Sequence, residues 1–148
     1  MMWPFKRVRW EVKGKPMSNA AAYAIIRVKL EPSAIFLKDC NFRALPIADF
    51  EKIIFDCWFP RDFSKYKPEI WDCDNYAVAF MAAVQERWAK ISRGKEALLF
   101  GYISANLKGT GQHAFIWLIN DSGELHYYEP QTGREFKPEM ISVRLVES

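Results

Sequence analysis

One long apolar stripe constrains the fold more than any other feature of the sequence. Between Asp72 and Gly94 the apolar residues recur at intervals of three and four, at Ala77, Phe80, Met81, Val84, Trp88 and Ile91. This spacing predicts an amphipathic helix that lays one face on a hydrophobic core. Aspartate at its start and glycine at its end are typical helix boundaries. The rest of the chain must therefore supply an apolar surface that covers this face.

The segments around this helix predict an α+β fold. Residues 46–55 have the apolar spacing of a second helix, and residues 58–71 predict an irregular connection. Strands are predicted at residues 23–30, 97–104, 113–120, 124–129 and 141–146, where apolar residues alternate or run together. Most strands follow the long helix, so we expect an antiparallel sheet with the helices packed on one side of it.

Size and charge exclude several classes of protein. The 148 residues, half of them hydrophobic, predict a single domain over residues 1–148, with residues 1–20 as a basic N-terminal arm. No run approaches the roughly 20 apolar residues that span a bilayer, so no membrane span is predicted. A net charge of +3 argues against nucleic acid as a partner. Three cysteines without a close pair predict free thiols and a cytoplasmic location. The oligomeric state is left open.

Cys73 is the first candidate for chemistry, because it stands at the start of the long helix. The positive end of the helix dipole favours a thiolate there, and unpaired amides can stabilise an oxyanion. Asp72 and Asp74 flank the cysteine, and their negative charges oppose its ionisation. A bound calcium ion would neutralise them, since carboxylate oxygens suit calcium.

A predicted hairpin brings His113 and Glu129 together. Asp121-Ser122-Gly123 suits a three-residue loop that ends in glycine with a left-handed conformation. This loop pairs Asn120 with Glu124 and makes His113 and Glu129 diagonal neighbours on one face, whereas a shift by one residue would separate them. A cysteine, a histidine and a carboxylate in this order are the groups that thiol hydrolysis requires.

Short motifs around these residues resemble a known superfamily. The segment Asp72-Cys73-Asp74-Asn75-Tyr76-Ala77 resembles the corresponding segment of bacterial transglutaminase-like cysteine peptidases. The segment Gln112-His113-Ala114 is similar to their Gly-His-Ala strand, and Glu129-Pro130-Gln131 stands where their acidic third residue is expected. The spacing of cysteine, histidine and glutamate also resembles that of the papain-like protease domain of a mushroom agglutinin.

The resemblance implies a papain-like/transglutaminase-like fold, whose central helix starts at the cysteine and packs on a sheet carrying His113 and Glu129. It also implies an enzyme, a cysteine peptidase or amidase acting on a peptide or protein substrate by hydrolysis or acyl transfer. In that reading Cys73 is the nucleophile, His113 the base and Glu129 the group that orients the base. Oxyanion or substrate contacts are expected from Gln112, Asn75, Trp71 and Gln131. No cofactor is required for the chemistry, and the resemblance nominates Asp72 and Asp74 for calcium.

One departure from the family pattern supports an alternative. Papain-like enzymes place a glutamine shortly before the cysteine to line the oxyanion hole, and Lys65, Lys67 and Pro68 occupy this stretch here. The alternative is a catalytically silent binding module on the same fold, such as a phage or plasmid accessory protein. Structural roles also remain open, in which Cys73 packs as a small apolar residue and Asp72 caps the helix. An ordinary thiol pKa at Cys73 would favour the binding module.

Overall fold

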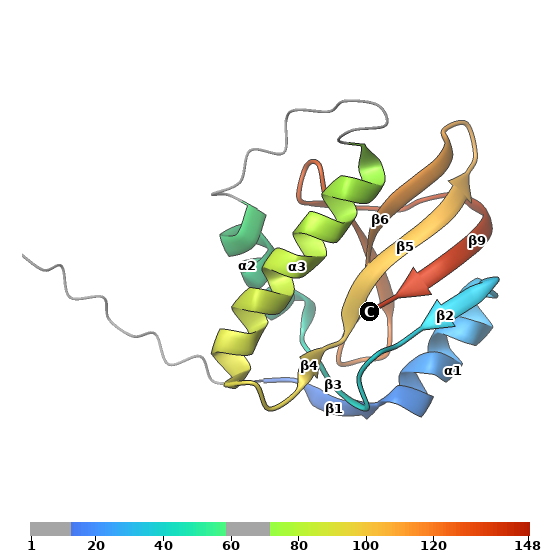
Figure 1. Ribbon diagram of the computed structural model, residues 1–148. Helices are drawn as coiled ribbons and strands as arrows, with labels where there is room; N and C mark the ends of the chain where they lie inside the picture. The colour runs from blue at the N-terminus through green and yellow to red at the C-terminus, as the bar shows by residue number, and fades with distance from the viewer. Residues whose placement is uncertain (1–12, 59–71) are drawn as a thin grey trace, which may run out of the picture.

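A mixed six-stranded sheet organises the computed structural model, which describes residues 13–58 and 72–148 (Figure 1). The strand order is β2-β9-β5-β6-β7-β8. β2 pairs with β9 in parallel, and all other neighbours in this sheet are antiparallel. The bounds are β2 (Ala34–Phe36), β5 (Phe100–Leu107), β6 (Gly111–Ile119), β7 (Leu125–Glu129), β8 (Arg134–Phe136) and β9 (Met140–Glu147).

A small second sheet and three helices complete the described part of the chain. The small sheet has the order β1-β3-β4, with β1 (Lys15–Ser18), β3 (Asn41–Ala44) and β4 (Ala97–Leu98). The helices are α1 (Asn19–Leu30), α2 (Ile47–Trp58) and α3 (Cys73–Ser92). Of the predicted N-terminal arm, residues 1–12 lie outside the described residues, while the following residues form β1 and begin α1.

The central strand β6 separates two hydrophobic cores. Its residues Ile116 and Leu118 pack with α2 and α3, and Phe115 and Trp117 pack on the opposite face with α1 and β3. Alternate side chains of a strand point to opposite faces, so a strand buried on both faces reads as the continuous apolar run seen here. The start of β6 is less deeply buried, and His113 lies in this half-buried part.

The long helix predicted from the apolar stripe is confirmed as α3. Its buried face includes Tyr76, Ala77, Phe80, Val84 and Trp88, and it packs against β4, β5 and β6. Asp72 is its N-cap residue with an extended backbone, and Arg93 ends it in the left-handed region. The helix predicted at residues 46–55 is α2. The predicted irregular connection over residues 58–71 lies outside the described residues, apart from position 58, which ends α2.

The strand predicted at residues 23–30 is wrong, because this segment belongs to helix α1. The Ser18 side chain accepts a hydrogen bond from the Ala21 amide at 3.2 Å and so caps the helix start. Ala22 and Ile26, four residues apart, form its buried face, whereas Val28 is 78% exposed. The apparent alternation therefore came from β-branched residues on different sides of a helix.

The predicted fold class is wrong in two structural respects. The main sheet is mixed rather than antiparallel, because the edge strand β2 pairs with β9 in parallel. Helices cover both faces rather than one, because α1 packs on the face opposite α2 and α3. Both differences follow from the N-terminal third, where the sequence pattern was misread. Among the described residues, no helix is both long enough and apolar enough to cross a membrane.

Candidate functional site

The first turn of α3 sets the position of Cys73. The Asp72 amide donates to Asn75 Oδ1 at 3.3 Å, and the Tyr76 amide donates to the Asp72 carbonyl at 3.1 Å. These bonds fix the helix start, with Cys73 as the first helical residue. The Cys73 thiol donates to Asp74 Oδ1 at 3.3 Å. The sulfur is half-buried, and the side chain that accepts its hydrogen bond is an acid.

Strand β6 meets this helix start at His113 and Ala114. A backbone hydrogen bond from Ala114 reaches the Cys73 sulfur, and α3 packs directly on β6. Ala114 follows His113 in the chain, so the cysteine lies beside the strand segment that carries the histidine. The structure therefore brings the cysteine of a helix tip to the histidine-bearing strand, as the sequence predicts.

His113 and Glu129 form a close pair. His113 Nε2 lies 2.6 Å from Glu129 Oε2, with the two side chains 15% and 21% exposed. The Glu129 carboxylate also accepts from the Gln131 amide at 3.2 Å, and the imidazole stacks on Phe115 with ring centroids 5.8 Å apart. The carboxylate and the aromatic ring together hold the imidazole in one orientation.

The predicted hairpin register creates this pair and is confirmed. β6 and β7 pair Ile119 with Leu125 and Ile116 with Tyr128, which is the register that the three-residue loop requires. The Asn120 amide donates to the Glu124 carbonyl at 3.0 Å, and Gly123 has a φ of 78°. Glycine adopts this left-handed conformation without a steric penalty, so the loop chemistry fixes which side chains share a face.

The environment of Cys73 disfavours a thiolate. Burial raises the pKa of the Cys73 thiol above its ordinary value of 9.0, and the backbone bond from Ala114 opposes this only in part. The hydrogen bond to Asp74 and the charges of Asp74 and Asp72 raise the pKa further. These surroundings favour the thiol over the thiolate. The stabilisation of the thiolate that was expected from the helix dipole does not outweigh these effects on the pKa.

The other predicted site residues lie around this group with different roles. Gln112 is exposed at the start of β6, and Gln131 is half-buried beside Glu129. Asn75 is exposed and its oxygen accepts from Asp72. Trp71 lies outside the described residues. Gln131 thus borders the His113–Glu129 pair and Asn75 holds the helix start, whereas strand alternation directs Gln112 to the face opposite His113.

The predicted calcium site has too few ligands among the described residues. No group of three or more histidine, cysteine, aspartate or glutamate side chains that could hold a metal occurs within residues 13–58 and 72–148. Calcium takes six to eight oxygen ligands, and Asp72 and Asp74 supply two carboxylates. Calcium at Asp72 and Asp74 stays a prediction.

Sequence reasoning missed a cavity away from these residues. It has a volume of about 590 Å³ and lies where the C-terminal half of α3 passes β4 and the segment joining β2 to β3. Its lining comes from four segments that are distant in the chain, including residues 38–41 and 94–98. Each segment contributes only a few side chains, so no local motif in the sequence signals this cavity.

Solved structures share this fold. The Polyporus squamosus lectin bound to the human-type influenza-binding epitope Neu5Acα2-6Galβ1-4GlcNAc matches with a TM-score of 0.68 and 22% identity, covering 88% of this chain and 49% of that chain. The structure of a PSL1a-E64 complex matches with a TM-score of 0.69 and 20% identity, covering 90% of this chain and 50% of that chain. At these identities the likeness establishes the fold. No curated protein matches the chain.

These matches correct the recognition made from the sequence. The papain-like/transglutaminase-like assignment, both as family and as fold class, gives way to the fold of the Polyporus squamosus lectin structures. The predicted enzyme depended on that assignment and is corrected with it, namely a hydrolase or cysteine protease with a catalytic triad that acts by hydrolysis or acyl transfer at peptide or amide bonds of a peptide substrate. The raised pKa of Cys73 agrees with this correction, because it disfavours the thiolate that such chemistry requires.

The family match rests on the part of the chain that carries the site. The agglutinin C-terminal family matches residues 51–135, which include α3, β5, β6 and β7 together with Cys73, His113 and Glu129. This range is more than half of the chain, and the chain spans about half of the length of the solved structures that it matches. The chain belongs to the agglutinin C-terminal family.

Proposed function

We propose that this chain is a non-catalytic module that binds carbohydrate at the His113–Glu129 pair, next to the helix start that carries Cys73. The observation that carries the proposal is the setting of Cys73, a half-buried thiol that donates to Asp74, because burial and the two acidic neighbours raise its pKa. A neutral thiol is a poor nucleophile, so a binding role suits the site better than covalent chemistry. The agglutinin family and the sugar epitope on the Polyporus squamosus lectin support carbohydrate as the ligand class.

The polar groups of the site match the hydroxyls of a sugar. A hydroxyl both donates and accepts hydrogen bonds, and a carboxylate, an imidazole and an amide offer both kinds of partner. The His113 ring is oriented by Glu129 and Phe115, so it loses little conformational freedom when a ligand binds. Gln131 is half-buried beside Glu129 and supplies an amide at the edge of the site.

Calorimetric titration with Neu5Acα2-6Galβ1-4GlcNAc tests the proposal. His113→Ala removes the imidazole, and Glu129→Gln removes the carboxylate charge that orients it, so each should weaken binding about tenfold or more, corresponding to roughly 1.4 kcal/mol. His126→Ala is the matched control, since His126 pairs with Glu135 at the other end of the hairpin. The control variant should bind like the wild type. A thermal melt of each variant establishes that it is folded.

Two results would overturn the proposal. One is the absence of binding by the wild-type chain to this trisaccharide and to a panel of other glycans. The other is turnover of peptide or amide substrates that disappears in Cys73→Ala, because a binding module leaves its ligand unchanged. Cys73→Ser should retain affinity within about twofold, since it keeps a small hydrogen-bonding side chain in place of the thiol.

A further inference from the structure

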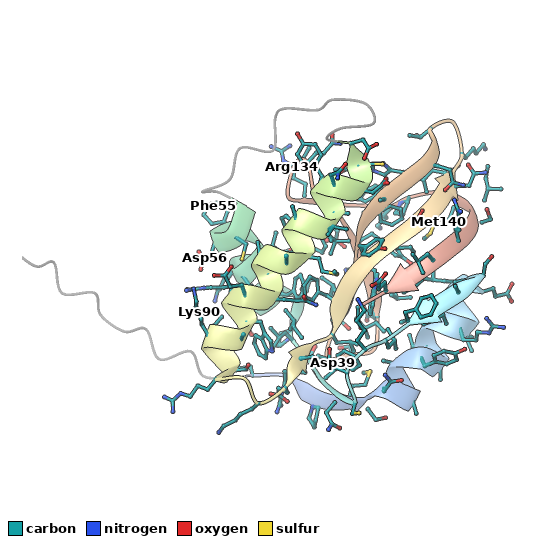
Figure 2. All side chains as sticks on the ribbon, in the orientation of Figure 1. Asp39, Phe55, Asp56, Lys90, Arg134 and Met140 are labelled. Carbon is teal, nitrogen blue, oxygen red and sulfur yellow. The ribbon has the colours of Figure 1, made fainter. Side chains whose placement is uncertain are left out.

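We propose that the loop end of the β6–β7 hairpin is an acid-sensitive latch, in which protonation of His126 transfers a hydrogen bond of its ring from Asn120 to Glu124. The latch does not depend on the proposed carbohydrate site, because the β6–β7 ladder lies between the two. Arg134, labelled in Figure 2, begins β8, and its chain neighbour Glu135 is the remaining member of the latch.

The loop fixes which way the side-chain amide of Asn120 points. Asn120 is 7% exposed, and its Oδ1 accepts from the backbone amides of Ser122 at 3.0 Å and Glu124 at 2.9 Å. The oxygen cannot change places with the amide nitrogen without the loss of both bonds. The donor Nδ2 therefore faces His126 Nε2, at a distance of 3.2 Å.

This donor determines the tautomer of the neutral His126 ring. Nε2 accepts from Asn120, so the ring proton is on Nδ1. Nδ1 lies 2.7 Å from Glu135 Oε1 and donates to it. The His126 side chain is half-buried, and its two ring nitrogens are bonded to different partners in different ways. The ring can satisfy both partners only while Nε2 carries no proton.

A second proton on the imidazole breaks this arrangement. The proton binds Nε2, and two donors then face each other where Asn120 meets the ring. Glu124 Oε2 lies 3.6 Å from Nε2, and the Glu124 side chain is 68% exposed, so it has the freedom to move closer and accept the new N–H. The cationic ring is then bonded to the carboxylates of Glu124 and Glu135, and charge-assisted bonds of this kind are stronger than the neutral bond to an amide.

The charges on the hairpin and on β8 act on the ring with both signs. Glu124 and Glu135 favour the imidazolium, and Asp121 in the loop adds a third acid nearby. Lys137 follows β8 at the position that continues its pairing with β7 opposite His126, and its charge opposes protonation. The two carboxylates have ring nitrogens as their partners, so their effect is the more direct one.

The elements packed on this face of the hairpin leave the latch to these groups. On β6 the residue paired with His126 is the apolar Leu118. On α2 the Glu51 carboxylate accepts from the Tyr128 hydroxyl at 2.9 Å, and Asp49 pairs with Lys52 at 3.7 Å. These charges are engaged with other partners.

The transfer of the bond loosens the loop. The buried Nδ2 group of Asn120 loses its acceptor, which is unfavourable for a buried donor. The same side chain holds the amides of Ser122 and Glu124, so the loop should open more often when His126 is protonated. The strands keep their own backbone hydrogen bonds, and the change is confined to the loop.

NMR spectroscopy of the whole chain, labelled with ¹³C and ¹⁵N and titrated from about pH 8 to about pH 5, tests the latch. The ring nitrogen shifts of His126 should show the Nδ1–H tautomer at the start of the titration. The side-chain amide signals of Asn120 should then move with the same midpoint as the His126 ring. Hydrogen exchange at the amides of Ser122 and Glu124, corrected for the intrinsic effect of pH, should become at least about threefold faster.

Two matched variants assign the response to one histidine. His126→Gln offers Asn120 an acceptor that does not titrate, so the corrected exchange at the loop should stay constant over the whole pH range. His113→Gln removes the other of the two histidines and should leave the response of the loop intact. An Nε2–H tautomer of neutral His126 would contradict the latch, and so would Asn120 signals or loop exchange that do not follow the titration of this ring. A response that persists in His126→Gln, or disappears in His113→Gln, would contradict it as well.

Discussion

Several local effects act on the sulfur of Cys73 with opposite signs. The helix start and the Ala114 amide favour the thiolate, whereas burial and the carboxylates of Asp72 and Asp74 favour the thiol. The sequence shows the helix start and the two acids, but it does not show how deeply the helix tip is buried. Burial is the largest of the effects and depends on the packing of α3 against the sheet. The direction of the pKa shift of Cys73 could therefore not be predicted from the sequence alone.

The pH dependence of Cys73 alkylation tests this balance. Because burial and acidic neighbours raise its pKa, the midpoint should lie above the ordinary value of 9.0, and reactivity at pH 7 should be low. Asp74→Asn removes a hydrogen bond and a charge that both favour the thiol, so it should lower the midpoint and speed alkylation at pH 7. The measurement uses Cys40→Ser, which removes the exposed thiol, and mass spectrometry to assign the modified cysteine.

Asp121→Asn is the control for this experiment, since it changes an aspartate in the hairpin loop. It should leave the midpoint unchanged. A wild-type midpoint below pH 7 would show that the thiolate is the resting form and would remove the main physical support for a non-catalytic site.

The β6–β7 hairpin is the element whose geometry was most predictable. Its register follows from a three-residue loop that ends in glycine. The same register makes His113 and Glu129 diagonal neighbours on one face of the sheet. Local rules sufficed here because all interacting residues lie within about 20 positions of one another. For α1 the local pattern was misleading, because Ile25, Ile26 and Val28 satisfy a strand pattern while Ser18 caps a helix.

Gly123→Ala tests the role of the loop. The residue has a φ of 78°, and its nearest non-neighbouring atom would be 3.9 Å from an added Cβ, so the cost is conformational rather than steric. The free energy of unfolding should fall by about 1–2 kcal/mol. Gly123→Asn should cost less, because asparagine tolerates this conformation better. Chemical denaturation measures both variants.

Ser122→Ala serves as the control in the same loop. Ser122 is exposed, and the substitution keeps the hydrogen bond that its backbone amide donates to the Asn120 side chain. Its stability should match that of the wild type. Equal stability of Gly123→Ala and the wild type would contradict the left-handed loop and the register that depends on it.

At the scale of the whole molecule, the sheet and the cavity depend on contacts between distant parts of the chain. β2 and β9 pair Ala34 with Leu145, and residues 38–41 share the cavity with Ser148. Pairings at such separations leave no periodic signal in the sequence, so neither the mixed sheet nor the cavity could be predicted. The motifs did not determine the function either, because similar groups of residues can serve different roles on one fold.

The most direct test of the central claim is a saturation-transfer NMR experiment on Neu5Acα2-6Galβ1-4GlcNAc in the presence of the whole chain. A non-catalytic carbohydrate-binding module should transfer saturation to the sugar protons, lose most of this transfer in His113→Ala, and leave the ligand spectrum unchanged after prolonged incubation. No transfer from the wild-type chain, or the appearance of signals from a product, would contradict the account.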